Sequence, residues 1–234
     1  MKEYFVVTDV HGFYSILIKA LRDAGFEEGN PNHILISCGD LLDRGPEPLQ
    51  CLKFVNKLFT ENRAILIRGN HEDLMDDMIE RGFQLAHDKH NGTIETARIL
   101  TNHSERDIDW IWESISDMVV QSDYNLYRAS LVNNYELNDY IFVHGWVPSE
   151  TSDWKHACWL NGMEEWHRGN IIENKTIVCG HWYTSFGHYY YGDAKSEWGP
   201  EADFNPFVGK GIIALDACTA YSKQINVFKF EVKE

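Results

Sequence analysis

The sequence predicts an α/β protein built around a parallel sheet. Three times, a short apolar run leads into a polar loop and then into apolar residues at helical spacing. The three runs are residues 4–8, 34–38 and 64–67. Successive strand, loop and helix units imply parallel strands that are buried on both faces, and such sheets bind ligands where the strands end.

A helix is expected after each of these strands. Apolar residues recur three or four positions apart in residues 16–24, 49–59 and 74–79, which is the spacing of one helix face. From about residue 81 to 138 the pattern changes to polar, aromatic-rich helical segments that include 91–100 and 107–119. We interpret this stretch as a helical insertion beside the sheet.

Strand-like runs return after the insertion, at residues 140–143, 176–179, 211–215 and 225–232. Residues 184–210 have no clear periodicity and contain several glycines and prolines. Long loops in compact domains are usually functional, so we expect this one to form a rim over the mouth of the site. We expect residues 1–234 to form a single domain.

Charge and cysteine usage exclude several classes of protein. The 21 Lys and Arg residues against 36 Asp and Glu residues give a net charge of −15, and no basic run is present. A duplex-binding protein needs a basic stripe, so nucleic acid is not an expected partner. The five cysteines lack CxxC spacing and favour buried thiols. With neither a signal-peptide pattern nor a membrane-spanning run, we expect a cytoplasmic protein without a membrane partner.

Polar motifs follow the predicted strands and offer donors for metal ions. Asp-Val-His-Gly stands at 9–12, Gly-Asp-Leu-Leu-Asp-Arg-Gly at 39–45 and Arg-Gly-Asn-His-Glu at 68–72, while two later strands end in histidine. Oxygen and imidazole donors without thiolate suit Mn, Fe or Zn better than Ca or Mg, and six donors exceed one tetrahedral zinc. We therefore expect two divalent metal ions, Mn²⁺ foremost and Fe or Zn as alternatives, held by Asp9, His11, Asp40, Asn70, His144 and His181.

Taken together, the three motifs resemble the signatures of the phosphoprotein phosphatase branch of the calcineurin-like metallophosphoesterases, in order and spacing. The chain looks most similar to the small bacterial and phage serine/threonine phosphatases of the lambda phage type. Thr8 replaces the leading glycine of the first signature. The resemblance implies a four-layer α/β/β/α sandwich of two mixed sheets, with helices outside and a two-metal site at one sheet edge.

The resemblance also implies a role for each matching residue. Asp9 and His11 would hold the first metal, Asp40 would bridge, and Asn70, His144 and His181 would hold the second. A bridging hydroxide would attack phosphorus, and His71, oriented by Asp43, would protonate the leaving oxygen. Arg44, Arg68 and Asn70 would bind the phosphate.

One expected residue is missing from the pattern. Small members of the family carry a further phosphate-binding arginine, which we would align with residues 159–162, where no arginine stands. Either Arg168 takes this role from a shifted helix, or Asn161 contacts the phosphate as a neutral donor. Trp146, Trp182 and Trp198 lie next to the predicted site loops and could equally form a substrate wall or pack in the core.

The expected activity is metal-dependent hydrolysis of phosphomonoesters, with a serine/threonine phosphoprotein phosphatase as the leading hypothesis. The substrate would be a phosphorylated protein or peptide, or a small phosphoester. One alternative is a hydrolase of dinucleoside polyphosphates such as diadenosine tetraphosphate. A second is a catalytically idle protein that keeps its metals for binding, although such a protein would not need the acid His71.

Overall fold

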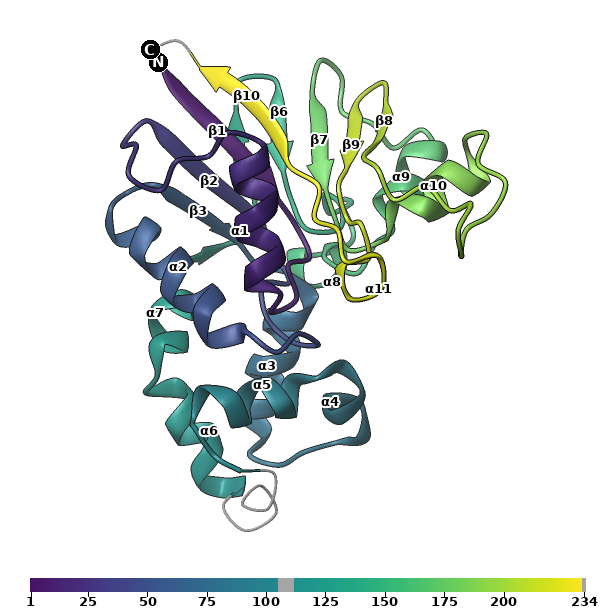
Figure 1. Cartoon of the computed structure of the whole chain (residues 1–234). Helices are drawn as coiled ribbons and strands as arrows, with labels where there is room; N and C mark the ends of the chain where they lie inside the picture. Colours follow the sequence, from purple (N-terminus) through teal and green to yellow (C-terminus); the bar gives the residue numbers. More distant parts are fainter. Residues whose placement is uncertain (105–111, 233–234) are drawn as a thin grey trace.

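The structure is a computed structural model that describes residues 1–104 and 112–232 (Figure 1). Its first sheet has the strand order β10-β1-β2-β3-β4. The bounds of these strands are β1 (Lys2–Val7), β2 (His33–Cys38), β3 (Ala64–Ile67), β4 (Leu131–Val132) and β10 (Phe228–Val232). Strands β1 to β4 run parallel to one another, and β10 pairs antiparallel with β1.

Helices follow the first three strands, as the sequence predicts. They are α1 (Tyr14–Asp23), α2 (Pro48–Thr60) and α3 (Asn70–Arg81). Each buries the apolar stripe that predicted it; Leu17 and Leu21 of α1, for example, are almost fully buried. Three consecutive βα units are thereby confirmed.

The second sheet has the order β5-β6-β7-β9-β8. Its strands are β5 (Tyr135–Leu137), β6 (Tyr140–Phe142), β7 (Thr176–Cys179), β8 (Phe207–Gly209) and β9 (Ile212–Ala214). The three central strands β6, β7 and β9 are parallel, whereas β5 and β8 pair antiparallel at the two edges. Both sheets are therefore mixed, as expected.

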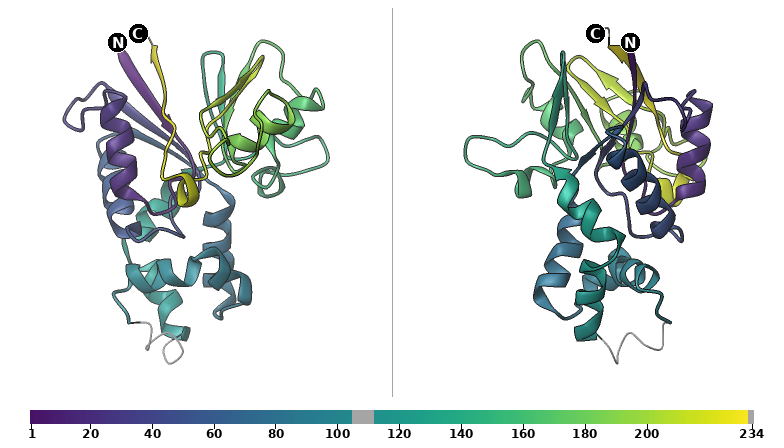
Figure 2. Two further views of the ribbon diagram at one scale, coloured as in Figure 1. Left: turned by 45° about the vertical axis from the view of Figure 1, so that its right-hand side comes forward. Right: turned by 90° about the vertical axis from the view of Figure 1, so that its left-hand side faces the viewer.

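Alternating side chains in the strands create the layers. In β1, Phe5 and Val7 join the core under the outer helices, while Tyr4 and Val6 point to the other face. That other face packs against Phe142 and other apolar residues of the second sheet. A third apolar cluster lies between the second sheet and its outer helices. The result is the four-layer α/β/β/α sandwich, with helices on the outer faces in Figure 2.

The helical insertion forms the end of the molecule that is lowest in Figure 1. It contains α4 (Ala86–Asn91), α5 (Thr93–Leu100), α6 (Trp112–Val120) and α7 (Asp123–Ser130). Residues 107–111 of the expected 107–119 helix lie outside the described residues. The expectation of helices up to residue 138 is wrong, because β4 pairs with β3 in one sheet and β5 pairs with β6 in the other.

The expected aperiodic rim at residues 184–210 is also partly wrong. It begins with α10 (Thr184–Tyr190) and ends with β8, whose Phe207 packs in the third apolar cluster. Three short helices complete the fold: α8 (Trp154–Ala157), α9 (Gly162–His167) and α11 (Thr219–Ser222). In the part of the chain that the structure describes, no helix is both long and apolar enough to cross a membrane.

Candidate metal centre and phosphate site

The predicted metal donors lie at the ends of strands from both sheets and meet at one edge of the sandwich. Asp9 follows β1 and Asp40 follows β2, while His144 and His181 follow β6 and β7. The backbone N–H of His181 donates to Asp9 Oδ2 over 2.9 Å, which joins the two sheets directly. Residues 172 positions apart are thus brought into hydrogen-bond contact.

Asp40 stands between two groups of donors. Its Oδ1 lies 3.4 Å from His144 Nε2, and its Oδ2 lies 3.8 Å from His11 Nε2. Ligand atoms of Asp40, His11 and His71 lie within 4.8 Å of one another, and so do those of Asp40, His144 and His181. Each oxygen of this carboxylate faces a different histidine, so Asp40 is in reach of both groups of donors.

Second partners of the histidines set which nitrogen faces this centre. His11 Nδ1 donates to the Leu42 carbonyl over 3.1 Å, and His144 Nδ1 donates to the Cys38 carbonyl over 2.8 Å. The Nε2 atoms are left facing the acidic groups, as in many metal sites. His144 Nε2 lies 2.8 Å from Asn70 Oδ1. A nitrogen and oxygens that converge in this way fit a divalent cation of the borderline class.

Burial and nearby charges shift the pKa values of these histidines in different directions. It lowers the pKa of His11 well below its usual value, with a further contribution from the Arg44 cation. Burial and the neighbouring His144 lower the pKa of His181 to about 3. The neutral imidazole that results is the form that binds metal. The pKa of His144 is raised, because Asp40 and Asp9 outweigh its burial.

His71 and Asp43 form a buried pair beside the centre. His71 Nδ1 donates to Asp43 Oδ2 over 2.7 Å, and His71 Nε2 lies 3.9 Å from Asp40 Oδ2. Burial opposes the charged imidazole, but Asp40 and Asp43 together raise the pKa of His71 above its usual value. An imidazole held in this way takes up a proton more readily than a free one, as a general acid requires.

Arg44 is the predicted phosphate residue that the structure places in the cluster. Its guanidinium donates to His11 Nε2 and to His71 Nε2, each over 3.0 Å. Arg68 instead donates through Nη1 to Asp73 over 2.9 Å and to Asp76 over 2.8 Å. The structure therefore ties the guanidinium of Arg68 to α3.

Both candidate substitutes for the missing arginine have hydrogen-bond partners within α9. Arg168 ends α9 with its side chain 61% exposed, where it pairs with Glu164 and Glu165. These pairs keep it on the helix surface, which corrects the expectation that it reaches the site. Asn161 is the N-cap of α9, and its side-chain oxygen accepts hydrogen bonds from the backbone of Met163 and Glu164.

Positive φ angles occur at several residues of the candidate site. Six proposed site residues have positive φ, a region that side chains other than glycine rarely adopt and that costs about 1–3 kcal/mol each. Their φ values are 49° for Asp9, 50° for His11, 52° for Asp40, 69° for Asp43, 63° for Arg44 and 65° for His181. Such clustering of strain is typical of functional sites.

Glu72 holds two of the site loops together, a role that sequence reasoning did not assign. Its carboxylate accepts hydrogen bonds from the backbone N–H groups of Asp40, Leu41 and Gly69 and from the Tyr127 hydroxyl. The two loops also approach closely at Gly39, where an added Cβ would lie 2.7 Å from the Cα of Gly69.

Asp216 is a second residue that the sequence analysis did not include. It follows β9 and is buried, with Oδ1 accepting the Cys218 backbone N–H over 2.7 Å. Burial, with Asp9 nearby, raises the pKa of Asp216 well above its usual range. An acid at a strand end, as at positions 9 and 40, is the sequence signal that could have found it.

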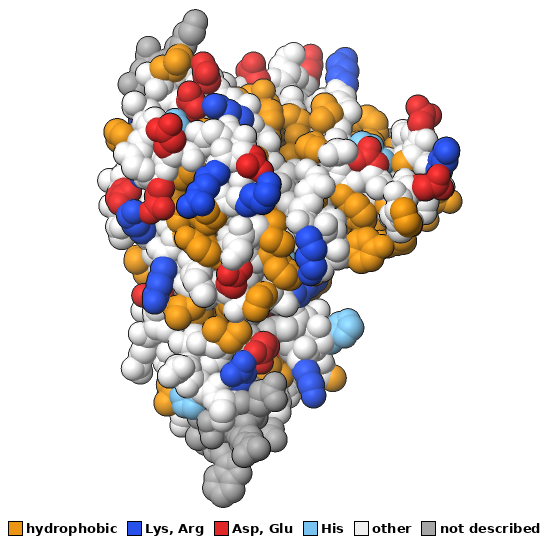
Figure 3. Space-filling view, viewed as in Figure 1, with side chains coloured by type: hydrophobic (Ala, Val, Ile, Leu, Met, Phe, Trp, Pro, Cys, Tyr) orange, Lys and Arg blue, Asp and Glu red, His pale blue; other side chains and the backbone are white. Residues whose placement is uncertain are grey.

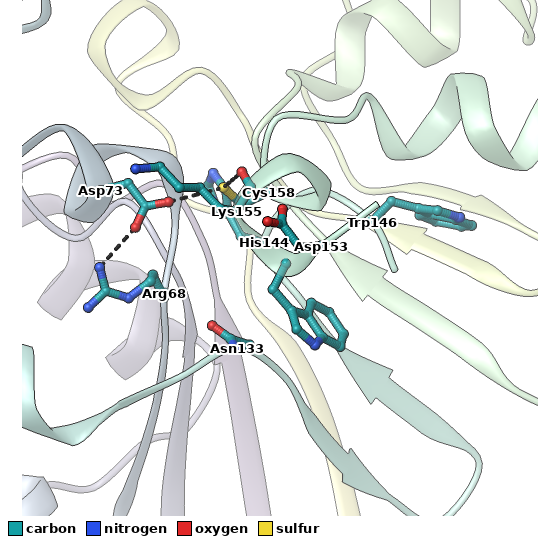
Figure 4. Close-up of a pocket in the computed structure, with 9 residues that line it drawn as sticks. Arg68, Asp73, Asn133, His144, Trp146, Asp153, Lys155 and Cys158 are labelled. Carbon is teal, nitrogen blue, oxygen red and sulfur yellow. Dashed lines mark hydrogen bonds and ion pairs between the residues drawn. The ribbon is translucent and has the colours of Figure 1, made fainter. Parts of the chain in front are cut away.

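A cavity of about 320 Å³ adjoins His144 (Figure 4). Arg68 and Asp73 lie on one side of it and Trp146 on the other, with Cys158 and Lys155 between. Lys155 Nζ donates to Asp77 over 3.0 Å, so this cation, like Arg68, is paired with a carboxylate.

The three tryptophans next to the site loops differ in burial. Trp146 is only 2% exposed and packs in the third apolar cluster, so it is a core residue. Trp182 is half-buried, with its ring 6.0 Å from that of His181. Trp198 is 42% exposed and contacts Tyr183 and Tyr221. Hydrophobic side chains gather on the lobe of α9 and α10 at the right of Figure 3.

Comparisons with known proteins show the family of the chain. The model of the calcineurin-like phosphoesterase family matches residues 4–197. Serine/threonine-protein phosphatase 1 of Salmonella typhimurium is 26% identical over 192 residues, which cover 80% of this chain and 78% of that protein. The asymmetrical bis(5'-nucleosyl)-tetraphosphatase PrpE of Bacillus velezensis is 34% identical over 74 residues, which cover 29% of this chain and 30% of that one.

Solved structures share the fold at lower identity. A cold-active protein-tyrosine phosphatase of a psychrophilic Shewanella species has a TM-score of 0.61 at 14% identity, over 99% of this chain and 76% of that one. A serine/threonine phosphatase of Saccharomyces cerevisiae has a TM-score of 0.52 at 19% identity, over 100% of this chain and 81% of that one. With a family match over most of its length, this enzyme belongs to the calcineurin-like phosphoesterases.

Proposed function

We propose that this protein hydrolyses phosphomonoesters with two divalent metal ions, and that its substrate is a serine or threonine phosphoprotein. The observation that carries the proposal is the placement of His71. Its Nδ1 is fixed on Asp43 at 2.7 Å, and its Nε2 faces the group of ligands that share Asp40. A protonated imidazole beside a metal centre suits a reaction whose leaving group is a strongly basic alkoxide.

The metal ligands in this proposal fall into two sets that share Asp40. Asp9 and His11 would hold the first ion, and Asn70, His144 and His181 the second. When bound, two divalent cations supply a more acidic water and neutralise charge on the phosphate. Mn²⁺ is the first ion to test, because the mixed oxygen and imidazole donors suit it; Fe and Zn are the next.

The remaining steps belong to the side chains. Arg44 would turn its guanidinium from the two imidazoles to the phosphate oxygens, which its planar fork can bind through two hydrogen bonds. This movement frees His71 Nε2 to hold the proton that the leaving oxygen needs. Arg68 would support the site indirectly, by fixing α3 through Asp73 and Asp76. If Arg44 is the one arginine that binds the phosphate, the phosphate should bind more weakly than it would to two arginines.

Hydrolysis of a dinucleoside polyphosphate is the second candidate. It is favoured by the 34% identity to PrpE of Bacillus velezensis over 74 residues. A catalytically idle binding protein is the third, and the buried His71–Asp43 pair argues against it, because metal-dependent recognition does not require a proton donor.

A substrate panel tests these hypotheses. The chain is assayed with a phosphoserine peptide and with diadenosine tetraphosphate, after loading with Mn²⁺, Fe²⁺ or Zn²⁺, and His71→Asn is the control for loss of the peptide activity. We expect faster turnover of the phosphopeptide. A large preference for diadenosine tetraphosphate would overturn the leading proposal, and turnover of neither substrate with any metal would support the binding protein.

A further inference from the structure

The helical insertion touches the turn that carries Asp43 and Arg44. Gly92, which precedes α5, has a φ of +88°, and an added Cβ there would lie 2.5 Å from the backbone nitrogen of Arg44. Only a glycine allows this approach without displacing the turn. The insertion is therefore in direct backbone contact with the candidate site.

Two threonines at the start of α5 bind Asp43. The Thr93 hydroxyl donates to Asp43 Oδ2 over 2.8 Å, and the Thr96 hydroxyl accepts the Asp43 backbone N–H over 3.1 Å. Thr93 has no exposed surface, and Asp43 is 1% exposed. Thr96 thus fixes the backbone of Asp43, whereas Thr93 fixes its carboxylate.

The position of Thr93 matters because one carboxylate oxygen receives both functional hydrogen bonds. Asp43 Oδ2 accepts from Thr93 and from His71 Nδ1, while Oδ1 is buried without a hydrogen-bond partner among the described residues. Rotation about the terminal torsion of an aspartate meets only a low barrier. Without the hydroxyl, His71 would be the one remaining side-chain donor to this carboxylate, and both groups could turn together.

We propose that Thr93 is a positioning residue for the proton donor: its hydroxyl locks the Asp43 carboxylate, and through it the ring of His71, toward the leaving oxygen. This inference rests on the proposed function. It gives the helical insertion a part in catalysis, since α5 supplies the group that completes the support of His71. Positioning partners of this kind typically contribute about 10- to 100-fold to activity.

The test uses substrates that differ in their need for a proton. The alkoxide of a phosphoserine peptide is strongly basic and needs the acid, whereas the p-nitrophenolate of p-nitrophenyl phosphate leaves readily without it. For Thr93→Val we expect kcat on the phosphopeptide to fall ~10- to 100-fold and kcat on p-nitrophenyl phosphate to fall less than ~3-fold. KM should change little, and Thr93→Ser should restore the peptide rate because it keeps the hydroxyl.

Two controls separate positioning from folding. Thr101 ends α5 and donates its hydroxyl to the Ala97 carbonyl over 2.8 Å, so Thr101→Val removes a hydroxyl of the same helix outside the site; both rates should stay at the wild-type values. Thermal melting of each variant shows whether it is folded. If Thr93→Val does not fold, Thr93→Ala is measured with the same two substrates.

The outcomes are distinct. Equal losses on both substrates in a folded variant, or an unchanged peptide rate, would overturn the role of Thr93. His71→Asn should show the same substrate discrimination with a larger loss; if it does so while Thr93→Val does not, the inference fails and the proposed function stands. If His71→Asn affects neither substrate, the proposed function fails and the inference falls with it.

Discussion

Replacement of Glu72 by glutamine should destabilise the protein more than its small chemical change suggests. The Glu72 side chain is buried, and four donors converge on it. Oε2 accepts from the Asp40 and Gly69 backbone nitrogens over 2.9 and 2.8 Å. Oε1 accepts from the Leu41 nitrogen over 3.1 Å and from the Tyr127 hydroxyl over 2.9 Å. A carboxylate can accept all four hydrogen bonds.

A glutamine keeps one acceptor oxygen and presents an NH₂ group in place of the other. In the better orientation the NH₂ group takes the place of Oε1, where the Tyr127 hydroxyl can turn and accept from it, so the Leu41 N–H alone loses its partner. The unsatisfied group costs roughly 1–3 kcal/mol, and the two hydrogen bonds that pass from a charged to a neutral acceptor lose ~1 kcal/mol each, so the free energy of unfolding should fall by about 3–5 kcal/mol. That is a large share of the 5–15 kcal/mol typical of a folded domain.

Urea denaturation of the metal-free protein measures this loss. Tyr127→Phe is the matched control, because it removes a single hydrogen bond to Glu72 and should cost only ~1 kcal/mol. If Glu72→Gln were no more destabilising than Tyr127→Phe, the idea that Glu72 ties the two site loops together would be refuted.

Three further expectations follow from the site. Asp40→Asn should lower the metal content at both positions. Two full equivalents of metal per chain by elemental analysis would contradict a bridging role for Asp40. Arg44→Ala should raise KM for a phosphopeptide at least tenfold, by loss of a charged hydrogen bond, whereas Arg168→Ala should change KM less than twofold, since its partners lie on its own helix. Burial lowers the pKa of His181 to about 3. Between about pH 6.5 and 3 the unfolded chain therefore takes up a proton at this residue that the folded protein does not. The stability that neutral His181 contributes is lost as pH falls through this range. His181→Asn should therefore flatten the acid side of the stability profile of metal-free protein by at most ~1.4 kcal/mol per pH unit, and an unchanged slope in urea denaturation would contradict this.

The strands that carry the site could be predicted because their signals are local. Residues 34–38 and 64–67 are apolar runs followed by polar motifs, and parallel strands bring their ends to one edge. The short edge strands β4 and β8 gave no such signal. β4 has two residues and β8 has three, so their conformation comes from the neighbouring strand and not from a pattern of their own.

Partners of the site residues could not be predicted in the same way. Nothing in the sequence indicates that Thr93 meets Asp43, 50 residues away, because the contact depends on how the insertion packs. The position of Arg168 could have been predicted from the sequence. Glu164 and Glu165 stand four and three residues before it, which is the spacing of helical ion pairs, so the sequence already offered it partners on its own helix.

The two sheets contribute different residues to the candidate centre. Metal binding would therefore affect the stability of the sandwich. Asp9, His11 and Asp40 follow strands of the first sheet, while His144 and His181 follow strands of the second. An ion held by Asp40 together with the two later histidines would link the sheets across their shared apolar layer. Because the unfolded chain does not hold these groups together, the free energy of binding would add to the stability of the packed sandwich. The strained backbone at the same residues would then be held partly by packing and partly by the ions themselves.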